Sequence, residues 1–453
     1  MSLSFLNPST RTLSDATGRV VFGVRARSWP VVTVAGFGAG YLVMYNGWVQ
    51  LCWLAAGLVF VAMTVGLRWI LEAWVRDGWL RSVAVLLAGV VVASGLVTQD
   101  SGADLGKMME RVSGAGLLWI LAALWWRVGS RPEEVAPLAK LMVAAGCVAG
   151  IAGLVGFSPH LLGSYQGHRL QNPLVYGGLN PVCTALTVGF SGMWAAVMAV
   201  RAGREAVAKR GSGGLWAGWS YWHAAQGLML VAVFFTLSRG GVLALAAGHA
   251  VLLGVWGWRR VWKTLAVTAA AAVVFLVVGT LRTPGADAAG GSVATSMERL
   301  EQGPVARMIQ RGDSSRLSIY QAGVAALQTP RDLLFGKGLW MDDDCWKCGL
   351  PSNPDHLHSA FVAALVQGGW LGLAGFLGVL AWGMRRLLWL ARRGDGVWLV
   401  LAAFGVAGLV FDGQSPFSLM TMPRFEALIL WMPLALGSAA YLRERQKEKP
   451  TVM

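Results

Sequence analysis

Charged side chains are scarce in this chain, because only 13% of its 453 residues are Asp, Glu, Lys or Arg, whereas 55% are hydrophobic. Soluble globular domains carry about 25% charged residues, so this composition excludes a water-soluble protein. We expect no cleavable signal peptide, since residues 1–29 are polar and basic and contain no apolar core. No internal repeat is visible. We expect the first apolar stretch itself to insert into the membrane.

Long apolar stretches make up most of the rest, and all but the short fourth one are near the length of about 17–25 residues that crosses ~30 Å of hydrocarbon as a helix. We therefore predict an all-α, polytopic membrane protein with about twelve transmembrane helices. The predicted spans are 30–46, 48–67, 82–98, 114–126, 137–157, 181–200, 216–237, 241–257, 263–281, 358–384, 396–411 and 425–442. They divide the chain into a cytoplasmic N-terminus (1–29), helices 1–9 (30–281), a large periplasmic loop (282–357), helices 10–12 (358–442) and a cytoplasmic tail (443–453).

The basic residues sort onto one side of this plan. With the N-terminus inside, the inside segments contain Lys and Arg clusters within 11–27, 68–81, 127–131, 201–210, 259–263, 385–393 and 443–449. The short outside loops contain only Lys107, Arg111, Arg169, Arg239 and Arg424. Because cytoplasmic loops are enriched in Lys and Arg, both termini are predicted to be cytoplasmic. The net charge of +15 then reflects membrane anchoring, and no basic soluble domain exists that would bind nucleic acid.

Two outside features contain arginines that could do chemistry. The turn at Ser238 and Arg239 joins two spans, and the following Gly240 and Gly241 would let a ligand approach the backbone. A charge between spans is costly unless it is paired, functional or snorkelling to the interface. In the long loop, Arg316 lies in the first turn of a predicted helix, where free N–H groups attract anions. The alternative for Arg239 is an arginine that snorkels to the interface, and the alternative for Arg316 is an amphipathic surface helix whose arginine binds lipid headgroups.

The pattern of this loop helix predicts its bounds and its packing. Asp313 or Ser314 would cap it, and Thr329 before Pro330 would leave helical geometry. Its apolar face is predicted to consist of Leu317, Tyr320, Val324 and Leu327.

Two histidines, His356 and His358, directly precede the tenth predicted span. A neutral imidazole at the membrane edge can act as a general base, and Asp355 could orient one of the rings. The alternative is that these histidines are only polar caps of the helix.

Two cysteines, Cys345 and Cys348, lie in the same loop after three aspartates at 342–344. In an oxidising compartment two thiols most simply form a disulfide. A zinc site formed by Cys345, Cys348, His356 and His358 is the alternative. We expect no metal and no other cofactor.

A transporter is the competing functional class. Ion-coupled carriers need ionisable groups inside their spans, yet the spans contain only Lys140, His223, His249 and Glu426 and no acidic pair. Broken inverted repeats are also not visible. Polar chemistry concentrated on one face favours an enzyme that acts on lipid-linked substrates.

At these motifs the sequence resembles the O-antigen ligase and Wzy-type polymerase superfamily of bacterial membrane proteins. Segment 236–241, with Ser238-Arg239-Gly240, is similar to the family's Ser-Arg-Gly signature at a span end. Segment 315–320 with Arg316, followed by Gly336-Lys337-Gly338, is similar to its loop helix and Gly-x-Gly. Arg169 resembles a further arginine of the loop before the sixth span.

The most specific likeness is to the ligase branch, whose motif is His, then Asn, Ser or Gln, nine residues, Gly, two residues and Gly. Here His358-Ser359 is followed by nine residues and then by Gly369 and Gly372. The recognisable motifs extend from about residue 165 to 375.

The resemblance implies transfer of a glycan from undecaprenyl diphosphate to an acceptor hydroxyl, which is lipid A-core for a ligase and a second lipid-linked repeat unit for a polymerase. It implies a multi-pass protein of the bacterial inner membrane, whose active site faces the periplasm. His358 would be the base, while Arg239 and Arg316 would bind the diphosphate. Arg169, His356, Ser238 and Lys337 would contribute to substrate binding. The reaction would invert the anomeric carbon and need no metal.

Overall fold

The computed structural model describes residues 20–21, 24–25, 28–44, 46–97, 105–162, 168–175, 177, 179–210, 219–281, 316–340, 356–419 and 425–448. These residues are almost entirely helical, apart from two two-residue strands, β1 (Val20–Val21) and β2 (Val24–Arg25), that pair antiparallel. The all-α class is therefore confirmed. The helices are α1 (Trp29–Val43), α2 (Gly47–Val65), α3 (Arg68–Arg76), α4 (Gly78–Val97), α5 (Leu105–Gly129), α6 (Pro132–Leu162), α7 (Pro181–Arg210), α8 (Tyr221–Phe235), α9 (Arg239–Trp256), α10 (Trp258–Leu281), α13 (Arg316–Ala325), α14 (Pro330–Phe335), α16 (Ala360–Arg392), α17 (Val397–Phe411), the π-helix η4 (Ala427–Trp431) and α18 (Met432–Lys447).

Each of the twelve apolar stretches coincides with a helix or, for the last stretch, with η4 and α18. Eight helices among the described residues are long and apolar enough to cross a membrane, and α1, α8 and α17 are shorter apolar helices. The count of twelve crossings stays a prediction. The fourth stretch, predicted as 114–126, is much longer in the structure, because α5 already begins at Leu105. Helix α3 is an amphipathic segment that the hydropathy pattern did not predict.

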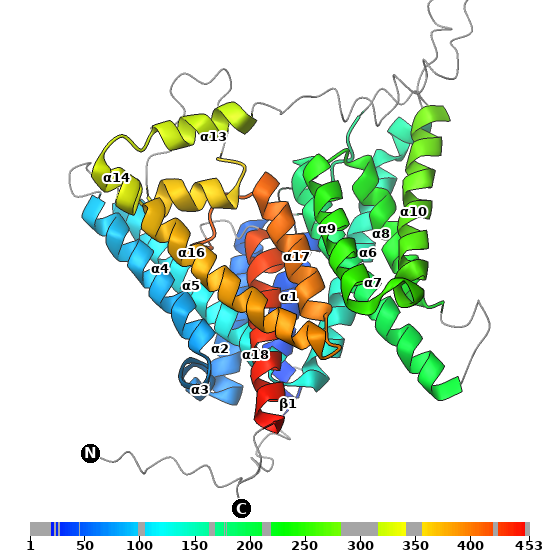
Figure 1. The fold of residues 1–453 in the computed structure, drawn as a ribbon, viewed down its shortest axis with the longest axis horizontal. Coiled ribbons are helices and arrows are strands. Elements are labelled where there is room, and N and C mark those ends of the chain that lie inside the picture. Colours follow the sequence, from blue (N-terminus) through cyan, green and yellow to red (C-terminus); the bar gives the residue numbers. More distant parts are fainter. Residues whose placement is uncertain are drawn as a thin grey trace, which may run out of the picture.

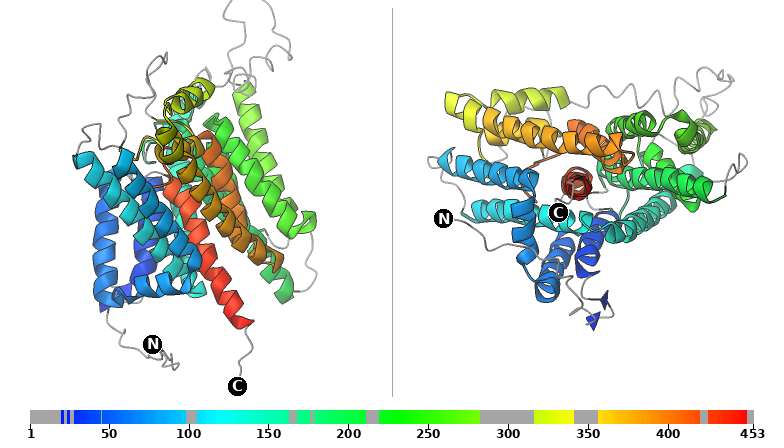
Figure 2. Two further views of the ribbon diagram at one scale, coloured as in Figure 1. Left: turned by 60° about the vertical axis from the view of Figure 1, so that its left-hand side comes forward. Right: turned by 60° about the horizontal axis from the view of Figure 1, so that its bottom comes forward.

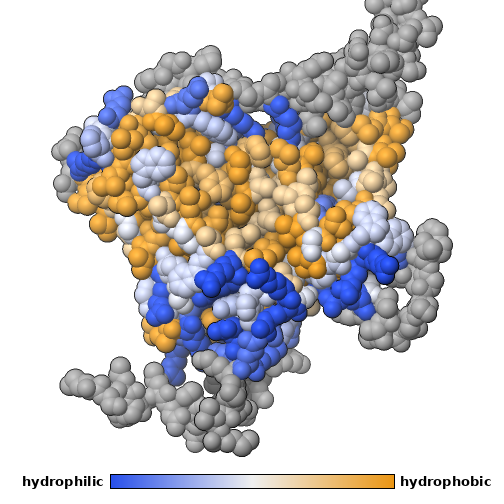
Figure 3. All heavy atoms as spheres, viewed as in Figure 1, coloured by the Kyte–Doolittle hydropathy of each residue, from blue (hydrophilic) through white to orange (hydrophobic). Residues whose placement is uncertain are grey.

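The helices form one bundle with an apolar waist. Helix α18 runs through the middle and packs against α5, α16 and α17 (Figures 1 and 2). Residues 181–200 of helix α7 are almost wholly buried. Hydrophobic side chains form a broad belt on the face seen in Figure 3, with hydrophilic side chains at its ends. This distribution is typical of a protein that spans a membrane.

The two ends of the bundle carry different elements (Figure 1). The lower end contains α3, the turn between α16 and α17, and the end of α18, all of which fall in segments predicted to be cytoplasmic. The upper end contains α13, α14 and the beginnings of α9 and α16. The predicted sorting of inside and outside segments therefore matches their placement at opposite ends, while the compartment that each end faces stays a prediction.

Helix α16 is broken near its beginning, and the break explains the spacing of the ligase-like motif. Gly369 has φ 62° and ψ −165°, a conformation essentially restricted to glycine. Residues 360–368 therefore lie across the upper end of the bundle, and the rest of α16 descends through it (Figure 1). Ser359 is the N-cap, and its hydroxyl accepts a hydrogen bond from the Val362 N–H. The nine residues between Ser359 and Gly369 are thus the length of this transverse helix.

The Gly-x-Gly segment closes the gap that the break leaves. The Lys337 N–H donates to the Val366 carbonyl at 2.7 Å, and the Gly338 N–H donates to the Gln367 carbonyl at 3.0 Å. These carbonyls lie in the turn before the break, where regular helical partners are lost. A Cβ on Gly336 would lie 2.5 Å from the Gln367 carbonyl, and a Cβ on Gly369 would lie 2.4 Å from the Leu334 carbonyl. Two motif glycines therefore serve one backbone-to-backbone contact.

We expect Gly369→Ala to destabilise the protein by several kcal/mol, because about 1–3 kcal/mol of backbone strain adds to the steric clash with Leu334. The matched control is Gly378→Ala in the same helix, where a Cβ meets nothing within 4 Å. Alanine should be neutral or slightly stabilising there. Thermal unfolding of the purified variants in detergent measures both effects, and equal melting temperatures would contradict the proposed contact.

The loop helix begins close to where it was predicted, but its packed face differs from the prediction. Thr329 is extended, as expected, and it caps α14, which begins at Pro330. The predicted apolar face is wrong in part, because Leu317 and Val324 are 57% and 45% exposed. Ile319 is buried instead and packs with Leu357 and Val366. The periodicity alone did not show which side of α13 meets α16.

Candidate active site

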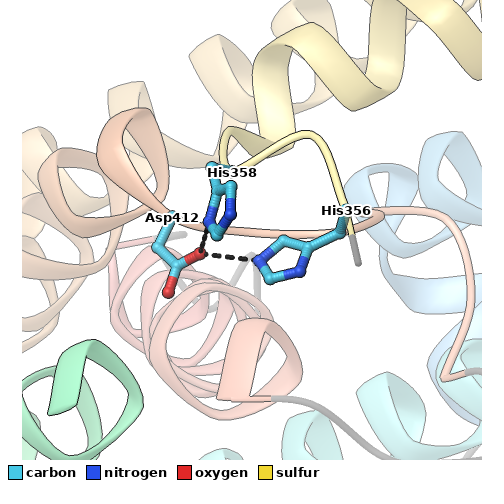
Figure 4. Close-up of side chains that lie close together, drawn as sticks. All are labelled: His356, His358 and Asp412. Atoms are coloured by element: carbon cyan, nitrogen blue, oxygen red, sulfur yellow. Dashed lines mark hydrogen bonds and ion pairs between the residues drawn. The ribbon is translucent and has the colours of Figure 1, made fainter. Parts of the chain in front are cut away.

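Two imidazoles and one carboxylate form a cluster between the beginning of α16 and the end of α17 (Figure 4). His356 Nε2 lies 3.0 Å and His358 Nδ1 lies 3.3 Å from the same oxygen, Oδ1 of Asp412. The histidines precede α16, and Asp412 directly follows α17. Asp412 is fully buried and His356 nearly so, whereas the His358 side chain is 23% exposed. Of the three, His358 is therefore the group that a substrate can reach most easily.

Hydrogen bonding in this cluster fixes the tautomers if the carboxylate is ionised. An ionised carboxylate can only accept, so each imidazole donates its N–H to Asp412. His358 then carries its proton on Nδ1, and its Nε2 is left with a lone pair. A neutral imidazole with a free Nε2, held by a buried carboxylate, has the arrangement of a general base.

Backbone strain falls on two of the motifs. Leu237 (φ 51°) and His358 (φ 53°) are the two non-glycine residues with left-handed backbone in the described part of the chain. Such conformations are uncommon for non-glycine residues, less so for histidine than for leucine, and they concentrate at functional sites. Leu237 directly precedes Ser238-Arg239, so the strain marks both the turn before α9 and the histidine of the ligase-like motif.

Helix α13 holds the histidine segment through a hydrogen bond to its backbone. The Tyr320 hydroxyl donates to the His358 carbonyl at 3.0 Å and contacts the Val410 carbonyl at 3.4 Å. Burial raises the pKa of Tyr320, while the nearby Arg316 cation lowers it and the Asp412 carboxylate raises it. Arg316, one turn before Tyr320, and Asp412 thus both lie close enough to Tyr320 to act on its hydroxyl.

Helix α9 brings the Ser-Arg-Gly signature to the end of α17. Ser238 is the N-cap of α9, and its hydroxyl accepts from the Gly241 N–H at 3.2 Å. Arg239 is the first helical residue and is partly exposed. A Cβ on Gly240 would lie 3.0 Å from Cβ of Phe411, the residue before Asp412. The glycine thus allows the turn that contains Arg239 to approach the end of α17. Ser238 acts as a helix cap in this arrangement.

Arg169 is attached to the same turn, which precedes Arg239. Its Nε donates to the Thr236 carbonyl at 2.8 Å, and the neighbouring Leu170 N–H donates to the Phe235 carbonyl at 2.9 Å. The loop 168–175 is thereby attached to the turn before Arg239.

The other predicted site residues have structural contacts or fall outside the described residues. Lys337 Nζ pairs with Asp332 at 2.7 Å, which helps to hold α14. A Cβ on Gly372 would lie 3.5 Å from the Ala364 carbonyl and would also meet Val90, within the packing of α16. Cys345, Cys348 and Asp355 lie outside the described residues.

A metal ion is a second chemical use of the cluster. His356, His358 and Asp412 each offer a ligand atom, and these atoms lie within 4.8 Å of one another. Imidazole and carboxylate are suitable ligands for zinc and related divalent ions. The residue set therefore fits a metal as well as a base held by a carboxylate.

Asp412 is the site residue that sequence reasoning missed. It lies 54 positions after His358, across two helices. Its sequence signal is its position directly after the apolar stretch 396–411, at the end predicted to face outside.

Comparison with known proteins agrees with the motifs. Residues 224–377 match the family model described as O-antigen ligase. The match begins in α8, includes Arg239, Arg316, His358 and both motif glycines, and ends in α16 before Asp412. No curated protein matches the chain. Residues 224–377 are thus an O-antigen ligase family domain, which confirms the resemblance to the superfamily of O-antigen ligases and polymerases.

Proposed function

We propose that this protein transfers a glycan from undecaprenyl diphosphate to a hydroxyl of lipid A-core during lipopolysaccharide biosynthesis. The observation that carries the proposal is the convergence of the motifs on one end of the bundle. The turn with Arg239 packs against the end of α17, and α13 with Arg316 bonds to the His358 carbonyl. Asp412, at the end of α17, binds the His358 ring.

In the proposed step, Nε2 of His358 accepts the proton of the acceptor hydroxyl. The hydroxyl oxygen forms a bond to the anomeric carbon of the donor sugar, and the bond from that carbon to the diphosphate oxygen breaks. The electron pair leaves with undecaprenyl diphosphate. Attack opposite to the leaving group inverts the anomeric carbon. Asp412 stabilises the imidazolium that forms, because its ionised carboxylate accepts the Nδ1–H.

Arg239 and Arg316 bind the diphosphate in this proposal, and Arg169 adds a third positive charge beside Arg239 that contributes to substrate binding. Guanidinium groups form two parallel hydrogen bonds to phosphate and keep their charge at every relevant pH. Arg239 also lies at the N-terminus of α9, which favours anions. With two arginines for the leaving group, a divalent ion is not required. The site would face the periplasm of a bacterial inner membrane, where both substrates are anchored.

We expect Arg239→Lys and Arg316→Lys each to reduce transfer by about 10–100-fold, because lysine keeps the charge but loses one hydrogen bond to a charged group. Arg331→Lys is the control, since Arg331 is an exposed arginine of α14 outside the cluster and should tolerate lysine. Initial rates with purified protein and a lipid-linked donor measure the effect. Full activity of both lysine variants would contradict diphosphate binding by paired hydrogen bonds.

A deletion strain tests the function as a whole. If the protein is a ligase, its loss should leave bare lipid A-core, while long polymer accumulates on undecaprenyl diphosphate. A polymerase, which shares the family domain, would instead leave core that carries a single repeat unit. A transporter would leave bare core with only short material on the lipid carrier. Lipopolysaccharide gels and extraction of carrier-linked glycan, with a complemented strain as the control, separate these outcomes.

A further inference from the structure

A cavity of about 230 Å³ lies at the lower end of the bundle, opposite the histidine cluster. Slightly more than half of its wall is apolar, and this part is formed by side chains of α6, α7, α17 and α18, including two buried tryptophans. These wall residues are Val135, Ala136, Trp194, Met198, Trp398 and Ala440. Three charged residues, Arg201, Asp395 and Arg443, also line it. The proposed glycan transfer uses none of them.

The two arginines come from different helices and are already held in place. Arg201 Nη2 contacts Asp395 at 2.5 Å, and Arg443 Nη1 donates to the Gly129 carbonyl at 3.0 Å. Arg443 Nε is 3.4 Å from Glu444, which also pairs with Lys447 at 2.9 Å. A guanidinium has five N–H donors, so both arginines have donors beyond these contacts.

The charge balance of the cavity favours an anion. Among the lining residues two guanidinium groups stand against one carboxylate, which is already paired with Arg201, while Glu444 beside Arg443 lies outside the lining and is shared with Lys447. Arg204, one turn later on α7, donates to the Gly394 carbonyl at 3.4 Å and adds another cation beside Asp395. The Arg201 and Arg443 side chains are 35% and 26% exposed, so a ligand can reach them.

We propose that this cavity binds an anionic phospholipid of the surrounding membrane. The phosphate would contact Arg201 and Arg443, and an acyl chain would lie along the apolar wall. Basic pockets between transmembrane helices are suited to anionic headgroups. The wall argues for a lipid rather than free phosphate, because inorganic phosphate gains nothing from apolar contact. A bound lipid would join the α5–α6 turn, α7 and α18, and would stabilise the bundle by binding only the folded state.

The test is lipid titration of the delipidated, full-length protein, followed by native mass spectrometry. Phosphatidylglycerol should bind several-fold more tightly than phosphatidylethanolamine. Arg201→Gln and Arg443→Gln should each weaken phosphatidylglycerol binding about fivefold, which corresponds to about 1 kcal/mol per basic residue near a charged surface. The matched control is Arg76→Gln on α3, a paired arginine at the same end and outside the cavity. It should leave binding unchanged.

A second variant keeps every charge and fills the cavity instead. Ala136 is an exposed residue of the wall, so Ala136→Trp should fold and still reduce retention of phosphatidylglycerol. Equal affinity for both lipids, or an equal loss in the Arg76 variant, would overturn the proposal. Displacement of the lipid by millimolar inorganic phosphate would also overturn it, because the site would then recognise a small anion alone.

Discussion

Replacing His358 with alanine should reduce glycan transfer by about 10²–10⁴-fold, the usual contribution of a general base. His358 is the most exposed member of the cluster, and its Nε2 is the nitrogen that faces away from the bond to Asp412. Because Arg239 and Arg316 remain in place to bind the diphosphate, the affinity for the lipid-linked glycan should change little. Initial rates with purified protein give kcat and KM separately, and a lipopolysaccharide gel of the complemented deletion strain gives the result in cells.

The left-handed backbone of His358 requires a second variant. Alanine at φ 53° carries strain that could affect folding. Asparagine tolerates this conformation and has no basic nitrogen, so His358→Asn should fold normally and be as inactive as His358→Ala. His356→Ala is the comparison within the cluster and should be milder, because the His356 side chain is only 8% exposed, against 23% for His358. Equal losses at His356 and His358 would contradict a single general base.

The sequence predicted the local features of the site because each one is encoded over a short distance. The resemblance gave the spacing of Ser359 and Gly369, and the structure shows that Ser359 caps the transverse helix and that Gly369 turns the chain after it. The spacing between them measures that helix. Likewise, Ser238 caps α9, so the Ser-Arg-Gly signature places Arg239 at a helix beginning without knowledge of the fold.

The features that the sequence did not predict depend on contacts between distant segments. Asp412 meets His358 beside a close contact of Gly413 with Ala360, where a Cβ on the glycine would lie 2.9 Å from Ala360. The side of α13 that packs was missed because Leu317 and Ile319 are equally apolar, and only the position of α16 decides which one is buried. The direction of residues 360–368 also required the structure, since hydropathy does not separate a transverse helix from a crossing one.

Asp412→Asn should lower kcat by about 10²-fold or more, because the variant loses the charge that stabilises the imidazolium of His358 during proton transfer. KM should stay within about threefold of the original value, since a fully buried carboxylate does not touch the substrate. In the original protein the Gly413 N–H donates to Asp412 Oδ1 at 3.0 Å. The amide oxygen of asparagine can accept the same hydrogen bond, so the fold should persist. Asp412 is therefore a positioning residue that acts through His358.

Two comparisons decide between this role and the alternatives. Glu72→Gln removes an acidic charge from an exposed pair on α3 and should leave kcat unchanged. A fall in the melting temperature of Asp412→Asn that matches its loss of activity would assign Asp412 to folding alone. If EDTA inactivates the original protein and one divalent metal restores it, the carboxylate and both imidazoles are ligands. The proposed metal-independent base would then be wrong. Full activity in EDTA, together with the loss in Asp412→Asn, supports a buried carboxylate that holds His358 in the tautomer needed for catalysis.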